Sequence, residues 1–178
     1  MPVQGFNSRQ YMVTPDYEYF HYKDRTTVEV DYHNHDFYEV YCLISGKVTY
    51  VIEGRSYKLQ PGDILLVSNK EIHRPIIDAS EEYERIVIWV NPDFLKRQGG
   101  ESCDLTACFE AAATAAAHNL LRPDPDMSNA LRGILSKFEK AGSRSAFGSE
   151  LLRHMYLVEL MVHINRAFGS SRGEGVQP

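Results

Sequence analysis

Four ionisable side chains give the strongest chemical signal in the sequence. His33, His35 and Glu39 are separated by even numbers of residues, and His73 follows further along the chain. Because side chains alternate between the two faces of a β-strand, an extended backbone places the first three on one side. An antiparallel neighbour can return His73 to the same point. Three imidazoles and a carboxylate are a ligand set for Zn, Ni, Mn or Fe(II).

The sequence leaves three interpretations of this group open. It can be a divalent metal site that keeps open positions for water or a ligand. It can be a metal-free polar pocket that hydrogen-bonds a small-molecule effector. It can also be a set of polar residues at a barrel rim whose hydrogen bonds are satisfied without a ligand. Since buried imidazoles and carboxylates are costly without partners, we expect each to have one.

Aromatic residues near this group are candidates for a pocket wall, with ordinary core packing as the alternative. Tyr41 shares the parity of Glu39, and Trp89 lies on the last apolar strand, where its ring could stack on a ligand. Arg85 could pair with an anionic effector, but its position favours an exposed strand end. Cys42 has the opposite parity and is expected to pack in the core. No residue is assigned as catalytic; the predicted effector-binding residues are His33, His35, Glu39, Tyr41, His73 and Trp89.

Short strands must position these side chains. Alternating or continuous apolar runs predict strands at 27–32, 38–44, 47–52, 56–59, 64–67, 73–77 and 85–90. The turn signals between them include Ser45-Gly46, Glu53-Gly54 and Pro61-Gly62-Asp63. Short strands joined by tight turns are typical of an antiparallel sandwich or barrel, which we expect to end near Val90.

The remainder of the chain is predicted to be helical. A capped short helix begins at Asn91, residues 105–121 are rich in the helix former alanine, and a helix opens at Asp124-Pro125. A last helix is predicted from about Phe147 to Phe168, ending at Gly169. That helix is apolar over most of its circumference. It is either enclosed by the barrel and the preceding helix, or packed on its copy in a second subunit.

Composition limits the class of protein. The 178 residues are 43% hydrophobic and 24% charged, as in an ordinary globular domain. The sequence shows neither a signal peptide nor an apolar run of about 20 residues, so it predicts a cytoplasmic protein without a membrane partner. Three cysteines without a Cys-x-x-Cys pair argue against a disulfide framework. A net charge of −5 argues against DNA binding by this segment.

The spacing His33-x-His35-x3-Glu39-x6-Gly46 resembles the first motif of the cupin superfamily. The segment 59–67, His73 and the helices after the strands are similar to the cupin arm of AraC-type transcriptional regulators, and the likeness covers roughly residues 10–168. It implies a barrel that binds a small effector, helices that form a homodimer, and a C-terminal helix-turn-helix pair that binds DNA. That last part is missing from this sequence, so DNA is expected as a partner only through such a domain.

The resemblance predicts a mainly β fold, a cupin (double-stranded β-helix) barrel followed by a short helical region and an antiparallel helix pair. The predicted divisions are a flexible arm at 1–10, the barrel at 11–91, the helical dimerisation region at 92–168 and a linker or tail at 169–178. The alternative is a small metal-dependent cupin dioxygenase or isomerase. Enzymatic cupins usually have a Pro-x-Gly turn before the later histidine and an Asn four residues after it. Here residues 68–72 lack the turn and Ile77 takes the Asn position, which weakens the enzyme interpretation.

Overall fold

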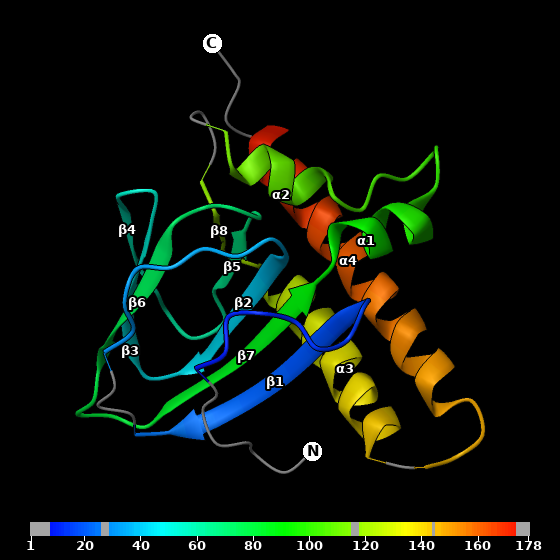
Figure 1. The fold of residues 1–178 in the computed structure, drawn as a ribbon, viewed down its shortest axis with the longest axis horizontal. Coiled ribbons are helices and arrows are strands. Elements are labelled where there is room, and N and C mark those ends of the chain that lie inside the picture. Colours follow the sequence, from blue (N-terminus) through cyan, green and yellow to red (C-terminus); the bar gives the residue numbers. More distant parts are fainter. Residues whose placement is uncertain (1–7, 26–28, 115–117, 144, 174–178) are drawn as a thin grey trace.

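The computed structural model describes residues 8–25, 29–114, 118–143 and 145–173 (Figure 1). The strands are β1 (Tyr17–Asp24), β2 (Tyr38–Ser45), β3 (Lys47–Ile52), β4 (Arg55–Lys58), β5 (Ile64–Val67), β6 (His73–Asp78), β7 (Tyr83–Val90) and β8 (Leu120–Leu121). The helices are α1 (Pro92–Gly99), α2 (Ala107–Ala112), α3 (Pro125–Gly142) and α4 (Ser149–Gly173). The predicted class, mainly β with C-terminal helices, is confirmed.

The strands form two antiparallel sheets instead of one closed ring in the described part of the chain. The larger sheet has the order β1-β7-β2-β5-β8 and the smaller one the order β4-β3-β6. A core cluster between them includes Tyr41 and Leu65 of the larger sheet and Tyr50 of the smaller. The chain passes from one sheet to the other at Gly46, whose φ is +105° and where a Cβ would lie 3.0 Å from the Glu82 carbonyl oxygen. Glycine suits both constraints.

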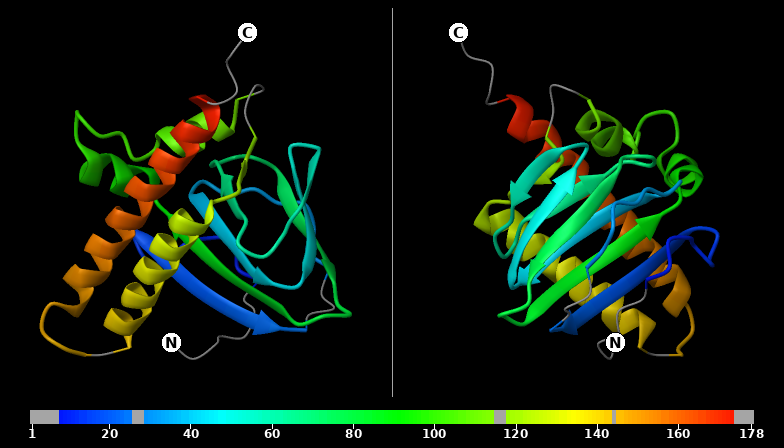
Figure 2. Two further views of the ribbon diagram at one scale, coloured as in Figure 1. Left: turned by 180° about the vertical axis from the view of Figure 1, so that it is seen from behind. Right: turned by 60° about the vertical axis from the view of Figure 1, so that its left-hand side comes forward.

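The helices cover the other face of the larger sheet. Figure 2 shows α3 and α4 side by side and antiparallel, with the smaller sheet on the far side of the larger one. The buried face of α4 is formed by Leu157, Leu160, Met161, Ile164 and Phe168. These side chains share a core with α3 and with the outward-facing residues of β2, β5 and β7. No helix among the described residues has the length and apolar character needed to span a membrane.

On the opposite side of α4 and just before it, large apolar side chains are exposed in the described part of the chain. Phe147, just before α4, and Leu151, Leu152 and Met155 at the start of α4 are 107%, 67%, 46% and 57% exposed, and we call these four residues the outer α4 face. Enclosure within the protomer, the first explanation offered for this apolar helix, therefore applies to its inner face, and packing on a second subunit stays a prediction for the outer α4 face.

The predicted helix caps are confirmed, because Asn91 accepts a hydrogen bond from Asp93 N (2.9 Å) and Asp124 accepts one from Met127 N (2.8 Å).

Four expectations about the bounds of helices and strands are corrected. Residues 29–32 of the predicted strand 27–32 are not a strand, and the rest of it lies outside the described residues. The β region does not end at Val90, since β8 pairs with β5. Among the described residues of the alanine-rich segment 105–121, which exclude 115–117, only α2 and β8 are regular, and α4 continues past Gly169 to Gly173. Residues 1–7 of the predicted arm and 174–178 of the predicted tail lie outside the described residues.

Candidate functional site

Three of the four predicted ligands come together at one end of the sheets. His33 forms an isolated bridge with His73, through His33 N to His73 O (3.1 Å) and His73 N to His33 O (2.9 Å). The ring centroid of His73 is 4.3 Å from that of His33 and 4.9 Å from that of His35. One ring nitrogen from each histidine lies within 4.8 Å of the other two. The β-bridge and the turn into β2, rather than one continuous strand, bring these rings together.

The hydrogen bonds of the three rings leave the same nitrogen available in each. The Nδ1 atoms bond the backbone carbonyls of Asp31, Phe37 and Glu71 at 2.9, 2.8 and 2.8 Å, for His33, His35 and His73 respectively. A carbonyl only accepts, so each Nδ1 carries a proton and a neutral ring then has its lone pair on Nε2. The Nε2 atoms of His35 and His73 are buried and have no hydrogen-bond partner among the described residues. A divalent metal ion fits this donor set.

Glu39 lies beside this group on β2. Its Oε2 is 3.7 Å from His35 Nε2 and accepts a hydrogen bond from Trp89 Nε1 at 3.0 Å. Its Oε1 accepts one from the Tyr50 hydroxyl, also at 3.0 Å. Both carboxylate oxygens are therefore held by donors of neighbouring strands. In this conformation Glu39 borders the three histidines, and its role as a metal ligand remains a prediction.

Burial and neighbouring charges set the protonation of the site. Burial alone would raise the pKa of Glu39, but the neighbouring imidazoles of His35 and His73 and the hydrogen bond from the Tyr50 hydroxyl lower it to about 2. Burial lowers the pKa of His73 to about 4, more than the Glu39 carboxylate raises it. At neutral pH the site therefore combines an ionised carboxylate with a neutral imidazole, which is the protonation that metal ligation requires.

A cavity of about 70 Å³ opens between the two sheets next to these residues. At 10–15 Å³ for each water molecule, it holds roughly five water-sized groups. Of the predicted effector-binding residues, His33, Glu39, Tyr41 and Trp89 line it, whereas His35 and His73 do not. The wall also contains Tyr22, Tyr50, Tyr83 and Arg85. As the parity argument predicted, Cys42 points to the other side of the sheet and packs against the helices.

The prediction of an exposed Arg85 is wrong, because this residue is 2% exposed and lies on the cavity wall. Its Nη1 donates to Asp24 Oδ2 at 2.7 Å, and its guanidinium carbon lies 4.7 and 4.2 Å from the ring centroids of Tyr22 and Tyr83. β7 is flanked by β1 and β2, so its side chains face either the cavity or the helices. Arg85 shares the parity of Trp89, and this signal could have placed it inside.

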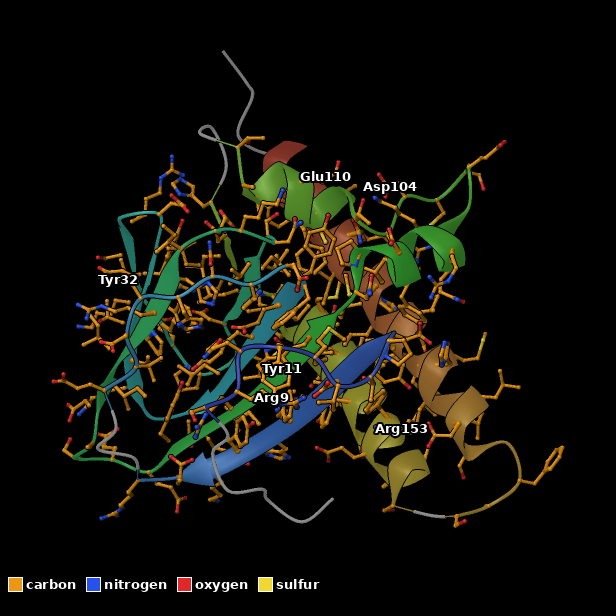
Figure 3. The ribbon with its side chains drawn as sticks, viewed as in Figure 1. Arg9, Tyr11, Tyr32, Asp104, Glu110 and Arg153 are labelled. Atoms are coloured by element: carbon orange, nitrogen blue, oxygen red, sulfur yellow. The ribbon has the colours of Figure 1, made fainter. Side chains whose placement is uncertain are left out.

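The N-terminal segment reaches the same cavity. The aromatic residues Tyr17, Tyr19, Phe20 and Tyr22 all lie on β1, and Tyr22 contributes to the wall. Arg9 also lines the cavity, with its guanidinium carbon 5.5 Å from the ring centroids of both Tyr11 and Trp89. Figure 3 shows the Arg9 and Tyr11 side chains on the segment that lies over β1 and β7. The Glu18 carboxylate on β1 accepts hydrogen bonds from Arg9 and from the Val13 and Thr14 amides, which fixes this segment.

Comparisons with known proteins found similar solved structures and one matching family model. Similar solved structures include a cupin protein from Bacteroides fragilis (20% identity, 51% of this chain and 86% of that one, TM-score 0.39). A second is a cupin-2 domain protein from Shewanella frigidimarina (22% identity, 49% of this chain and 83% of that one, TM-score 0.39). A third is a salicylate 1,2-dioxygenase from Pseudaminobacter salicylatoxidans (18% identity, 44% of this chain and 23% of that one, TM-score 0.40). No curated protein sequence matches the chain. The model of the AraC-like ligand binding domain matches residues 17–159, and the chain therefore belongs to this family.

Proposed function

We propose that this chain is the effector-sensing and dimerising domain of a cytoplasmic AraC-type transcriptional regulator. The observation that carries the proposal is the cavity between the sheets, where tyrosine hydroxyls, Glu39 and Arg85 converge beside the three histidines. These groups bond one another or, in the case of Arg85, the adjacent Asp24, and a small polar ligand would exchange some of those bonds for bonds to itself. Membership of a ligand-binding family supports the same function.

A divalent transition metal is the cofactor that the site suits. His33, His35 and His73 would hold it through Nε2, and Glu39 would add a carboxylate next to it. A bound ion would act as a Lewis acid toward an oxygen-bearing ligand. The backbone carbonyls that bond the three Nδ1 atoms orient the rings for this purpose.

The effector is a compact polar molecule, because the cavity admits only roughly five water-sized groups at 10–15 Å³ each. The hydroxyls of Tyr41 and Tyr83 lie 2.5 Å apart and can exchange this mutual bond for bonds to ligand oxygens. The Trp89 ring forms a flat part of the wall. His35 and His73 would contribute through the metal and not by direct contact.

The homodimer would form through the outer α4 face, with a second copy of the chain as its occupant. Leu151 and Met155 of this face are followed by the partly buried Val158 and Val162, so that the four side chains lie at intervals of four, three and four residues along α4. This spacing suits helix-on-helix packing across a two-fold axis. DNA would be bound by a separate C-terminal domain of the kind found in AraC-type regulators.

A metal-dependent cupin enzyme is the second candidate function, favoured by the three converging imidazole donors. It predicts turnover of a substrate that depends on the metal. The sensor predicts binding without turnover. Ile77 stands where enzymatic cupins usually have an Asn, and this departure favours the sensor.

The proposed metal is tested by elemental analysis of the purified, untagged protein. We expect about one equivalent of a transition metal, lost in His35→Ala but retained in His118→Ala, whose histidine is exposed and outside the cluster. The effector site is tested by a thermal-shift screen of small polar compounds on wild type and Tyr41→Phe. A stabilising compound whose effect is lost in Tyr41→Phe supports the sensor. Absence of any stabilising compound, or catalytic turnover of one, argues against it.

A further inference from the structure

One loop fixes the relative positions of all three histidines. We call residues 68–73, which connect β5 to the start of β6, the histidine loop. Lys70 N donates to His35 O at 2.8 Å, and His73 N donates to His33 O at 2.9 Å. The carbonyl of Glu71 accepts from His73 Nδ1 at 2.8 Å and so orients that ring. The geometry of the three Nε2 atoms therefore depends on the conformation of this loop.

The Glu71 side chain closes the histidine loop. Its Oε2 accepts a hydrogen bond from Ser68 N at 2.6 Å, and Glu71 N donates to Ser68 O at 3.3 Å. Between them Lys70 has a φ of +78°, a left-handed conformation that is unfavourable for a lysine. The Glu71 carboxylate is buried, so its position determines whether this turn keeps its shape.

A residue outside the two-sheet core holds that carboxylate. Asn119, 3% exposed, lies between α2 and α3, and its Nδ2 donates to Glu71 Oε1 and Oε2 at 3.1 and 3.0 Å. Nδ2 also donates to Leu66 O at 2.9 Å, while Oδ1 accepts from the Tyr57 hydroxyl at 3.1 Å. The side-chain amide of Asn119 thus uses both ends to bond strands and the histidine loop.

We propose that Asn119 is a positioning residue for the metal ligand His73, an inference that rests on the proposed metal site. Asn119 fixes the Glu71 carboxylate, Glu71 closes the histidine loop, and the Glu71 carbonyl orients His73 Nδ1. The same segment continues through β8 to Asp124, which caps α3. A change in the conformation of the histidine loop would therefore shift the segment that leads into α3, which packs against α4.

The test compares Co²⁺ affinity and the visible spectrum of bound Co²⁺ in full-length variants of this chain. Asn119→Ala removes the donor to Glu71. Asn119→Asp keeps the volume and the acceptor for Tyr57 but also loses that donor. Both are expected to weaken Co²⁺ binding roughly tenfold, the lower end of effects seen for outer-shell partners of metal ligands, and to alter the spectrum.

Arg122→Ala is the matched control. It removes the bidentate bond from Arg122 to Asp63 (2.8 and 2.8 Å), which anchors the same segment without contacting the histidine loop. We expect it to lower thermal stability and leave Co²⁺ affinity unchanged. Wild-type affinity in Asn119→Asp, or an equal loss of affinity in Arg122→Ala, would overturn the positioning role alone. A wild-type protein that binds no Co²⁺ would refute the metal site and this inference together.

Discussion

Replacing Met155 with glutamate should dissociate the proposed dimer. The four residues of the outer α4 face are 107%, 67%, 46% and 57% exposed. At about 180 Å² for each fully exposed side chain, they present about 500 Å² in each protomer. A symmetric pair would thus bury about 1,000 Å² from these residues, the lower limit for a specific interface.

The cost of the substitution follows from the area that Met155 contributes. Its 57% exposure corresponds to about 100 Å², or about 2.5 kcal/mol per copy at 25 cal/mol per Å². A two-fold interface contains Met155 twice, so the substitution would cost at most about 5 kcal/mol of the free energy of dimerisation. This corresponds to a more than thousandfold increase in the Kd of the dimer. Because Met155 is largely solvent-exposed in the protomer, the folded monomer should change stability by only about 0.5 kcal/mol or less.

Sedimentation velocity over the micromolar range measures this effect. We expect wild type to shift from monomer to dimer with concentration and Met155→Glu to remain monomeric. Gln98→Glu on α1 adds the same charge at an exposed position away from the outer α4 face and should behave as wild type. A wild-type protein that is monomeric at every concentration, or a Met155→Glu dimer as stable as wild type, would refute the reasoning.

Two further predictions concern stability in chemical denaturation. Glu18→Gln should lower the free energy of unfolding by about 1–2 kcal/mol, because it weakens the bonds from Arg9 and the Val13 amide. Burial raises the pKa of Glu18, but its hydrogen bonds outweigh burial and bring the pKa below the ordinary 4.5. The difference in stability between wild type and Glu18→Gln should therefore be complete above pH 4.5 and vanish as the pH falls through the lowered pKa. An equal difference at all pH values would contradict this. Phe109→Ala should cost about 3–5 kcal/mol, since the ring is fully buried and stacks on Tyr38 at 4.3 Å; a cost below about 1 kcal/mol would contradict the packing described.

Much of the fold could be predicted from local patterns. Two-residue alternation placed Glu39 and Tyr41 on one side of β2 and Cys42 on the other, because a strand buried on both faces still separates its neighbours by face. The helix caps at Asn91 and Asp124 were recognisable because capping depends on residues close in sequence.

Features that depend on distant contacts could not be predicted in this way. β1 is buried on both faces, so its aromatic run lacks the alternation that marks a half-buried strand. β8 has only two residues and is a strand because it pairs with β5, which is distant in sequence. Parity with Trp89 indicates the inward side of Arg85, but the partners that allow Arg85 and Asn119 to be buried, Asp24 and Glu71, are distant in sequence, and no local pattern identifies them.

The position of β1 also constrains how the chain can fold. Within the described ranges, this first strand pairs only with β7, the last strand of the two-sheet core before the helices. At a synthesis rate of about 5–20 residues per second, several seconds therefore pass between the synthesis of β1 and that of β7. Throughout that time the aromatic side chains and both backbone edges of β1 are unprotected, and the loop to be closed is long. Docking of β1 onto β7 is thus possible only after β7 has been synthesised, and until then the unpaired strand is a site at which nascent chains can associate.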